Sequence, residues 1–202
     1  MSNPLAIAMG DPAGIGPEIT AKAWTARALH SLAPFFAVGD PRAIEKVWDG
    51  PIARITDPAE AAGVFVDALP VLTVGDSVEV APGAPDVESA RGALQALEVA
   101  SGLTRSGAAS ALVTGPVSKA QLYRIGFTYP GQTEFVAERC GVAAENTVMM
   151  LAGPTLRVVP ITVHVALADV PALISQELIV AKARVTARGL HRNFGIEKPR
   201  LA

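Results

Sequence analysis

Short, continuous apolar runs recur along the chain, with polar and helix-forming segments between them. Runs of this length without polar alternation are typical of strands that are buried on both faces of a sheet. Because strand-like and helix-like segments alternate, the pattern predicts an α/β fold with a largely parallel or mixed sheet. The expected strands are Leu5–Met9, Phe35–Val38, Val71–Val74, Ala109–Val113, Thr147–Leu151 and Leu156–Thr162.

Helix start and stop signals fall between the apolar runs. A proline stands at the expected first position of two helices, an aspartate precedes a third, and Gly141 follows a fourth. These residue types favour helix boundaries, because proline fits the first turn, aspartate caps free N–H groups, and glycine adopts the left-handed conformation that ends a helix. The expected helices are Pro17–Leu29, Pro41–Trp48, Val87–Thr104, Thr133–Cys140 and Glu177–Phe194.

Three other segments bear on how the chain is organised. The Ala-Gly-Pro-Thr sequence between the fifth and sixth runs predicts a hairpin. The region from Pro51 to Pro85 is the least regular, and we expect loops with one strand there. Leu201–Ala202, after a turn at 197–200, resembles the start of a further buried strand, which suggests that the sequence is a part of a longer one.

The amino-acid composition excludes several classes of protein. Half of the 202 residues are hydrophobic and the mean hydropathy is +0.35, which is too apolar for intrinsic disorder. The net charge of −2 provides no basic field for a nucleic acid or an anionic membrane surface. The single cysteine, Cys140, excludes an internal disulfide framework. With no signal peptide and no apolar run of membrane-spanning length, we expect a soluble cytoplasmic protein.

Two glycine-containing segments follow expected strands. The first, Met9–Glu18, reads MGDPAGIGPE, and the second, Val113–Lys119, reads VTGPVSK. Ligands of open α/β sheets gather beyond the carboxyl ends of strands, where Lys119 could supply a positive charge. The glycine spacing in the first segment satisfies neither the dinucleotide fingerprint nor the P-loop pattern, so a tight structural turn remains an equal interpretation.

Two further segments contain candidate binding residues. Tyr129–Glu134 reads YPGQTE, a turn running into a helix, where Gln132 and Thr133 precede free backbone N–H groups; a capping-box variant is the structural alternative. His164 ends an expected apolar strand, and it is either a satisfied core histidine or a metal ligand.

Taken in order, GDPAGIGPE, VTGPVSK, YPGQTEF, VMMLAG and the strand ending in Thr-Val-His closely resemble the 4-hydroxythreonine-4-phosphate dehydrogenase (PdxA) family of vitamin B6 synthesis. The resemblance runs from Leu5 to Ala202. It identifies residues 1–202 as the N-terminal portion of such a dehydrogenase, with the C-terminal portion absent.

The resemblance implies a mixed-sheet fold of the isocitrate and isopropylmalate dehydrogenase type and a homodimer with shared active sites. It also implies oxidation of 4-phosphooxy-L-threonine with NAD, or NADP, and a divalent metal such as Zn, Mg or Co held by three histidines. The 3-oxo acid that is formed would lose CO2 to give 3-amino-2-oxopropyl phosphate. Neither a nucleic acid nor a membrane is an expected partner.

Residue by residue, the resemblance assigns His164 to the metal, Thr133 to the substrate and Gln132 to the position where the family usually has histidine. Lys119 is expected near them on the phosphate side. The other two metal histidines and most of the nicotinamide pocket belong to the absent portion, so we expect the 202 residues alone to be inactive. A dehydrogenase of another phosphorylated hydroxy acid, such as threonate 4-phosphate, and a non-catalytic binding module remain the alternatives.

Overall fold

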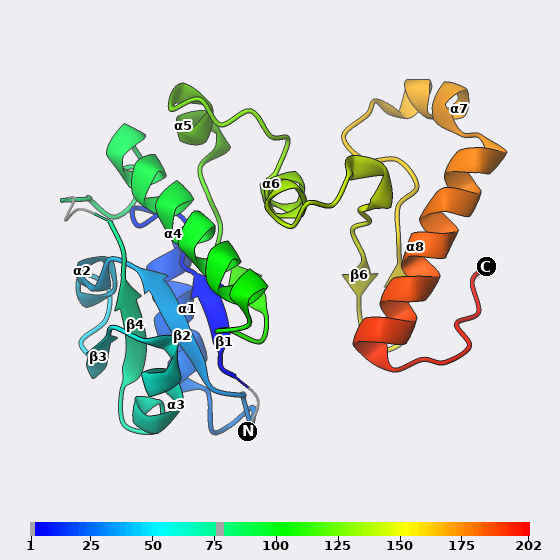
Figure 1. The fold of residues 1–202 in the computed structure, drawn as a ribbon. Coiled ribbons are helices and arrows are strands. Elements are labelled where there is room, and N and C mark those ends of the chain that lie inside the picture. The colour runs from blue at the N-terminus through cyan, green and yellow to red at the C-terminus, as the bar shows by residue number, and fades with distance from the viewer. Residues whose placement is uncertain (1–2, 76–78) are drawn as a thin grey trace. The chain divides into compact units, whose positions relative to one another are not determined.

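The computed structural model describes residues 3–75 and 79–202, and these residues fall into two compact units, residues 1–128 and 129–202. In the first unit the apolar runs form one five-stranded sheet (Figure 1). Every strand pairing in this sheet is parallel, and the strand order is β3-β4-β2-β1-β5. The strands are β1 (Leu5–Ala8), β2 (Phe35–Gly39), β3 (Ile52–Ile55), β4 (Leu69–Thr73) and β5 (Leu112–Thr114).

Helices cover both faces of this sheet, so its central strands are buried on both sides as their apolar sequences predict. One face packs on α1 through Ala21 and Trp24, and Ile7 of β1 lies against the same cluster. The opposite face packs on α4, which buries a stripe of alanines against β1 and β2 (Figure 1). The helices of this unit are α1 (Gly16–Thr25), α2 (Pro41–Glu45), η1 (Pro58–Glu60), α3 (Ala61–Val64), α4 (Val87–Ser106) and α5 (Lys119–Arg124).

The α/β class is confirmed, and the sheet of the first unit is parallel, which is one of the two expected alternatives. One detail of this unit's sheet differs from expectation. The region from Pro51 to Pro85 contains two strands, β3 and β4, rather than one; its residues 76–78 lie outside the described part. The signal of β3 is weak because the strand stands at the edge of the sheet, where Arg54 interrupts its apolar sequence.

The second unit begins with α6 and ends with the long helix α8. Ser175 caps α8 by accepting a hydrogen bond from the Leu178 amide at 3.1 Å, and Gly195 ends it with a φ of 66°. The expected hairpin is present as β6 and β7, an antiparallel pair much shorter than the apolar runs. The elements are α6 (Gln132–Arg139), η2 (Ala144–Asn146), β6 (Leu151–Ala152), β7 (Arg157–Val158), η3 (Leu167–Asp169), α7 (Val170–Leu173) and α8 (Gln176–Phe194).

Leu201 and Ala202 are in no strand among the described residues, and Leu201 is 48% exposed. The expectation that they begin a buried strand of a longer chain stays a prediction. Within the described residues, no helix combines the length and apolar character needed to cross a membrane.

Candidate functional site

β1 and β5 are neighbours in the sheet, and the connections that follow β1 and precede β5 run to opposite sides of β1. The carboxyl ends of these two strands therefore mark a topological switch point. The chain leaves β1 toward β2 on one side, and α4 later carries it back across the sheet to β5 on the other side. In open α/β sheets, ligands bind at this kind of position. The loop that follows β1 and the loop that leads from β5 to Lys119 lie side by side here, so the structure brings the first two motif segments together.

Backbone contacts join these two loops directly. The Asp11 amide donates to the Pro116 carbonyl at 2.9 Å, and the Gly115 amide donates to the Ala8 carbonyl at 2.7 Å. Gly10 has a φ of 80°, and a Cβ at this position would overlap the Pro116 carbonyl. A Cβ at Gly115 would likewise overlap the backbone of Met9. Both glycines therefore allow one loop to approach the other, which supports the structural interpretation of the first motif.

Asp11 is the buried polar residue of this junction, with a relative exposure of 2%. Its Oδ1 accepts a hydrogen bond from the Ala13 amide at 2.9 Å, and its carbonyl accepts one from the Gly14 amide at 2.9 Å. Its Oδ2 is buried and has no hydrogen-bond partner among the described residues. One carboxylate oxygen of Asp11 thus closes the turn between β1 and α1.

Sequence reasoning did not single out Asp11. The available signal was its place in a Gly-Asp-Pro-Ala turn directly after a buried strand, where an aspartate side chain commonly bonds the backbone two residues further on.

Lys119 is exposed and is the first residue of α5. Ser118, which precedes it, forms no side-chain capping bond, and Thr114 at the end of β5 is also exposed. A cation in the first helical turn is unfavourable with respect to the helix dipole. The role of Lys119 in binding an anion stays a prediction.

Gln132 and Thr133 are the first two residues of α6 in the second unit. Thr133 is exposed and Gln132 is half-buried. Gly131 precedes them as an N-cap without a side chain, so the capping-box alternative is not formed. The Oε2 atom of Glu134, in the same turn, is buried without a hydrogen-bond partner among the described residues. The start of α6 thus presents a hydroxyl group and an amide next to backbone N–H groups that lack helical partners.

Lys119 belongs to the first unit, whereas Gln132 and Thr133 belong to the second. Each residue is described within its own unit, and the expectation that they lie together stays a prediction.

His164 is not at the end of a buried strand, which corrects the expectation. It lies in a bend, it is exposed, and its φ of 60° is in the left-handed region. The apolar run before it forms only the two strand residues of β7, because Pro160 interrupts the segment and no further described strand pairs with it. The backbone conformation is costly for a residue with a Cβ, and such conformations concentrate at functional positions.

The described residues contain no group of three or more His, Cys, Asp or Glu side chains that could hold a metal ion. His164 is exposed, but within the described part of the chain it belongs to no such group. The described residues alone therefore do not form a complete metal site.

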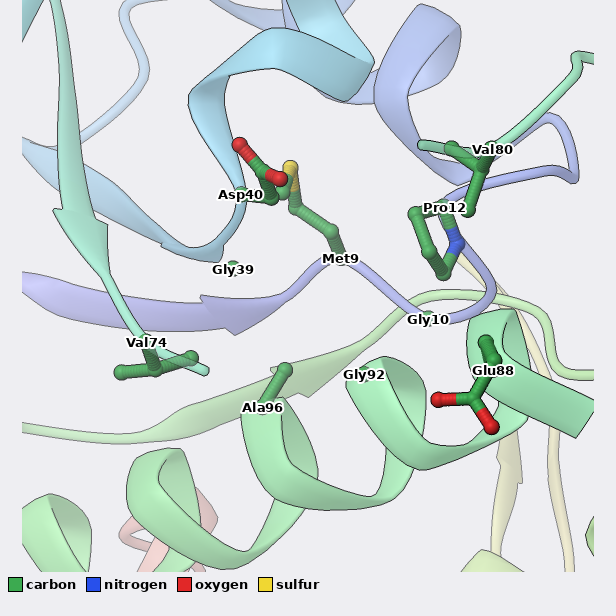
Figure 2. Close-up of a pocket in the computed structure, with 10 residues that line it drawn as sticks. All are labelled: Met9, Gly10, Pro12, Gly39, Asp40, Val74, Val80, Glu88, Gly92 and Ala96. Atoms are coloured by element: carbon green, nitrogen blue, oxygen red, sulfur yellow. The ribbon is translucent and has the colours of Figure 1, made fainter. Parts of the chain in front are cut away.

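A cavity of about 30 Å³ lies beside the junction, between the ends of β1 and β2 and the first turns of α4 (Figure 2). Asp40 and Glu88 contribute carboxylates to its wall, and Gly10, Gly39 and Gly92 keep it open. A volume of this size holds about one water molecule and is far smaller than a nucleotide pocket. As described, the cavity is too small to hold a nucleotide.

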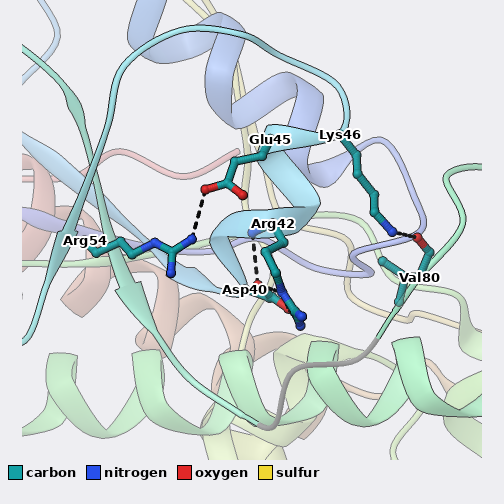
Figure 3. A network of polar contacts seen from close by, with 6 residues as sticks. All are labelled: Asp40, Arg42, Glu45, Lys46, Arg54 and Val80. Atoms are coloured by element: carbon teal, nitrogen blue, oxygen red, sulfur yellow. Dashed lines mark hydrogen bonds and ion pairs between the residues drawn. The ribbon is translucent and has the colours of Figure 1, made fainter.

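Asp40 directly follows β2, where many dinucleotide-binding folds place an acidic residue for ribose. Here its carboxylate is already engaged, because it caps α2 through the Arg42 amide at 2.9 Å and pairs with the Arg42 guanidinium at 2.5 Å (Figure 3). Burial raises the pKa of Asp40, but the hydrogen bonds from the Arg42 side chain and backbone lower it by more, so the pKa stays below its usual value. Asp40 therefore has a structural role in this chain.

Lys46 at the end of α2 donates to the Val80 carbonyl at 2.6 Å (Figure 3). The Gly83 amide donates to the Ala13 carbonyl at 2.7 Å, and the Gln121 side chain donates to the Pro85 carbonyl at 3.0 Å. Hydrogen bonds thus connect residues 80–85 to α2, to the loop after β1 and to α5. These contacts make the carboxyl edge of the sheet one connected structure.

Comparison with known proteins decides the family. The family model described as "Pyridoxal phosphate biosynthetic protein PdxA" matches residues 31–202. The chain belongs to the PdxA family. The 4-hydroxythreonine-4-phosphate dehydrogenase of Zymomonas mobilis is 52% identical over 198 residues, which cover 98% of this chain and 59% of that relative. The dehydrogenase of the same name from Erythrobacter litoralis is 50% identical over 204 residues, covering 98% of this chain and 60% of its own length.

The fold agrees with this assignment to the PdxA family. The crystal structure of the 4-hydroxythreonine-4-phosphate dehydrogenase of Klebsiella pneumoniae matches with a TM-score of 0.87 at 30% identity, over 98% of this chain and 62% of that one. The chain therefore spans about 60% of the length of the PdxA relatives that it matches.

Proposed function

We propose that this chain is the N-terminal part of a dehydrogenase that oxidises 4-phosphooxy-L-threonine (4-hydroxythreonine 4-phosphate) in pyridoxal phosphate synthesis. The observation that carries the proposal is the 52% identity, over nearly the whole chain, to a relative named for this activity. The oxidant is NAD or NADP, and the oxidised product loses CO2 to give 3-amino-2-oxopropyl phosphate. The enzyme acts as a cytoplasmic homodimer with shared active sites.

Thr133 and Gln132 bind the phosphorylated end of the substrate in this proposal. The Thr133 hydroxyl is exposed at the first turn of α6, where backbone N–H groups and the helix dipole both favour an anion. Gln132 can donate a hydrogen bond to phosphate oxygen but carries no positive charge, unlike a protonated histidine. Lys119, a cation that the dipole of α5 disfavours, supplies the compensating positive charge.

His164 serves as one metal ligand, and the remaining ligands come from outside the described residues. A divalent metal held there would lower the pKa of the substrate hydroxyl and so promote its oxidation. The glycine-rich loop after β1 does not hold the dinucleotide in this proposal, because Gly10 closely approaches Pro116, Gly16 closely approaches the Met9 carbonyl, and Asp11 is buried. Its function is to fix the segment that ends at Lys119.

The experiment uses a chimera in which this chain is continued with the C-terminal two-fifths of the Zymomonas mobilis relative. NADH formation is followed with 4-phosphooxy-L-threonine and with threonate 4-phosphate as substrates. We expect turnover of the first, with a raised KM in Thr133→Val and a lowered KM in Gln132→His. A preference for threonate 4-phosphate would replace the substrate in the proposal, and absence of turnover with either in a folded chimera would reject the proposed activity.

A further inference from the structure

Helix α8, the long helix of the second unit (Figure 1), has two opposite faces of different character. One face packs against the unit, since Thr186 and Leu190 are buried and Lys182 donates a hydrogen bond to the Thr147 carbonyl at 2.7 Å. Two positions after each of these three α8 residues, the sequence has an exposed arginine. The arginines are Arg184, Arg188 and Arg192. Because an α-helix turns by about 100° per residue, a shift of two positions places them on the opposite face.

The three arginines, together with the exposed His191 beside them, define what we call the arginine face. Among the described residues, none of the three arginines has an ion-pair or hydrogen-bond partner. The acidic residue of α8, Glu177, precedes Arg184 by seven positions, which is about 10 Å along the helix axis. The positive charge of the arginine face is therefore not neutralised by carboxylates of the described residues.

Helix stability does not account for this arrangement. Opposite charges four positions apart stabilise a helix, whereas like charges at that spacing, as in Arg184, Arg188 and Arg192, destabilise it. Basic residues in the last turn complement the helix dipole, and His191 and Arg192 lie there. Arg184 and Arg188 lie before that turn. Repulsion between them is relieved when an anion binds to both.

Positive charge is concentrated in this part of the sequence. Residues 182–200 contain six lysines and arginines and one acidic residue, so they carry +5, whereas the whole chain carries −2 with its histidines neutral. The remaining residues are therefore net negative and disfavour a long polyanion such as a nucleic acid. The line from Arg184 to Arg192 is only about 12 Å long. Its length and charge match a short acidic segment of a protein.

A hollow beside the arginine face gives room for such a segment. It has a volume of about 840 Å³, and its lining includes Arg188, His191 and Arg192. Glu197 is also in the lining, where the two arginines outweigh its charge. Asn146 and Asn193 add amide groups that can donate hydrogen bonds to carboxylate or backbone oxygens.

We infer that the arginine face docks an acidic segment of a partner protein, whose carboxylates are spaced about 6 Å apart, the rise of four helical residues. Guanidinium groups bind carboxylates through two parallel hydrogen bonds, and arginine suits this geometry better than lysine does. A helix with a glutamate at every fourth position would place carboxylates opposite Arg184, Arg188 and Arg192. Because such pairs remain partly solvated, binding is weak and sensitive to salt. The inference does not depend on which substrate the enzyme oxidises.

Fluorescence anisotropy with a labelled helical peptide that has a glutamate at every fourth position tests the inference. The measurement is made on the 202-residue chain and on the chimera with the Zymomonas mobilis C-terminal part. A peptide with glutamine at the same positions is the control. We expect only the glutamate peptide to bind, with an affinity that falls about tenfold between about 20 mM and about 200 mM NaCl. Equal binding of the two peptides, or binding of neither, would overturn the inference.

Matched arginine variants locate the binding. Arg188→Glu reverses the central charge of the arginine face, and Arg105→Glu makes the same change at an exposed position in the last turn of α4. We expect the first to weaken peptide binding by about tenfold and the second by less than about twofold. Arg188→Lys keeps the charge but loses the paired hydrogen bonds, so it should weaken binding by about threefold, and it serves as the test if Arg188→Glu does not fold. NADH formation by the chimera should be unchanged in all three. Equal losses of peptide affinity at positions 188 and 105 would reject the inference.

Other occupants of the arginine face would give different results. An oligouridylate that binds more tightly than the glutamate peptide and loses affinity in Arg188→Glu would assign the face to a nucleic acid and reject the inference. Peptide binding by the 202-residue chain that is absent in the chimera would show that the rest of the PdxA polypeptide covers the face, which also rejects it. A dimer in sedimentation that Arg188→Glu dissociates would assign the face to a second copy of the chain instead.

Discussion

The amide nitrogen of Asp11 lies 2.9 Å from the carbonyl oxygen of Pro116, and this hydrogen bond joins the loop after β1 to the loop after β5. The two glycine-containing segments, Met9–Glu18 and Val113–Lys119, are therefore parts of one junction. A glycine-rich turn between a strand and a helix suggests phosphate binding, but here the close approach is made to protein backbone. The junction holds the segment that leads from β5 to Lys119 against the loop after β1.

The first prediction concerns the close packing of this junction. Gly115→Ala would place a Cβ against the Met9 backbone and should lower the free energy of unfolding by about 1–3 kcal/mol or more. Gly102→Ala is the control, because Gly102 lies inside α4 with no atom close to an added Cβ, and it should raise stability by about 0.5–1 kcal/mol. Urea unfolding of both variants measures the difference. Wild-type stability in Gly115→Ala would show that the loops can separate freely.

The second prediction distinguishes the roles of the two carboxylate oxygens of Asp11 in stability. Asp11→Asn keeps an acceptor for the Ala13 amide and removes a buried charge, so its unfolding free energy should stay within about 1 kcal/mol of wild type. Asp11→Ala leaves the Ala13 amide without a partner and should cost about 1–3 kcal/mol. Equal losses in the two variants would mean that the charge on the unpaired Oδ2 is itself required for folding.

The pH dependence of stability provides the third prediction. The hydrogen bonds from Arg42 hold the pKa of Asp40 below its usual value despite burial, so ionised Asp40 stabilises the folded state. This contribution is complete above the unfolded-state pKa of about 4 and is lost as the pH falls through the lower folded-state pKa. Asp40→Asn should therefore reduce stability at pH 7 more than at about pH 2, measured by urea unfolding. An equal loss at both pH values would contradict the role of the ionised carboxylate.

The fourth prediction tests the backbone at His164. With a φ of 60°, this position should favour glycine over alanine, which reverses the usual order of stability in unfolding measurements. His164→Gly should be more stable than His164→Ala by about 1 kcal/mol. In the active chimera both variants should lose metal-dependent turnover, because both remove the imidazole. A more stable alanine variant would show that the left-handed conformation is not maintained in solution.

The hydrophobic pattern predicted the central strands and the long helices because burial on both faces leaves an unmistakable apolar run. Four of the five strands of the first sheet and the helix at 87–106 were found at nearly their expected positions. β3 was missed because an edge strand tolerates a charged residue such as Arg54. The segment 156–162 looked like a full strand, but strand length there depends on partners, and β7 pairs only through Arg157 and Val158.

The candidate site was only partly predictable for a related reason. The order of motifs identified the family, since several short segments in sequence are specific where each alone is weak. The burial of Asp11 and the engagement of Asp40 by Arg42 depend on which loops meet in space, and sequence spacing does not contain that information. The left-handed backbone conformation of His164 could not be predicted from the sequence either, because most histidines do not adopt it.

The most direct test of the account compares NADH formation by the 202-residue chain and by the chimera with the Zymomonas mobilis C-terminal part, each with 4-phosphooxy-L-threonine, NAD and a divalent metal. The chimera should turn the substrate over and should lose that turnover in His164→Ala, and the unextended chain should show none. Robust turnover by the unextended chain, or a folded chimera whose activity survives His164→Ala, would contradict the account.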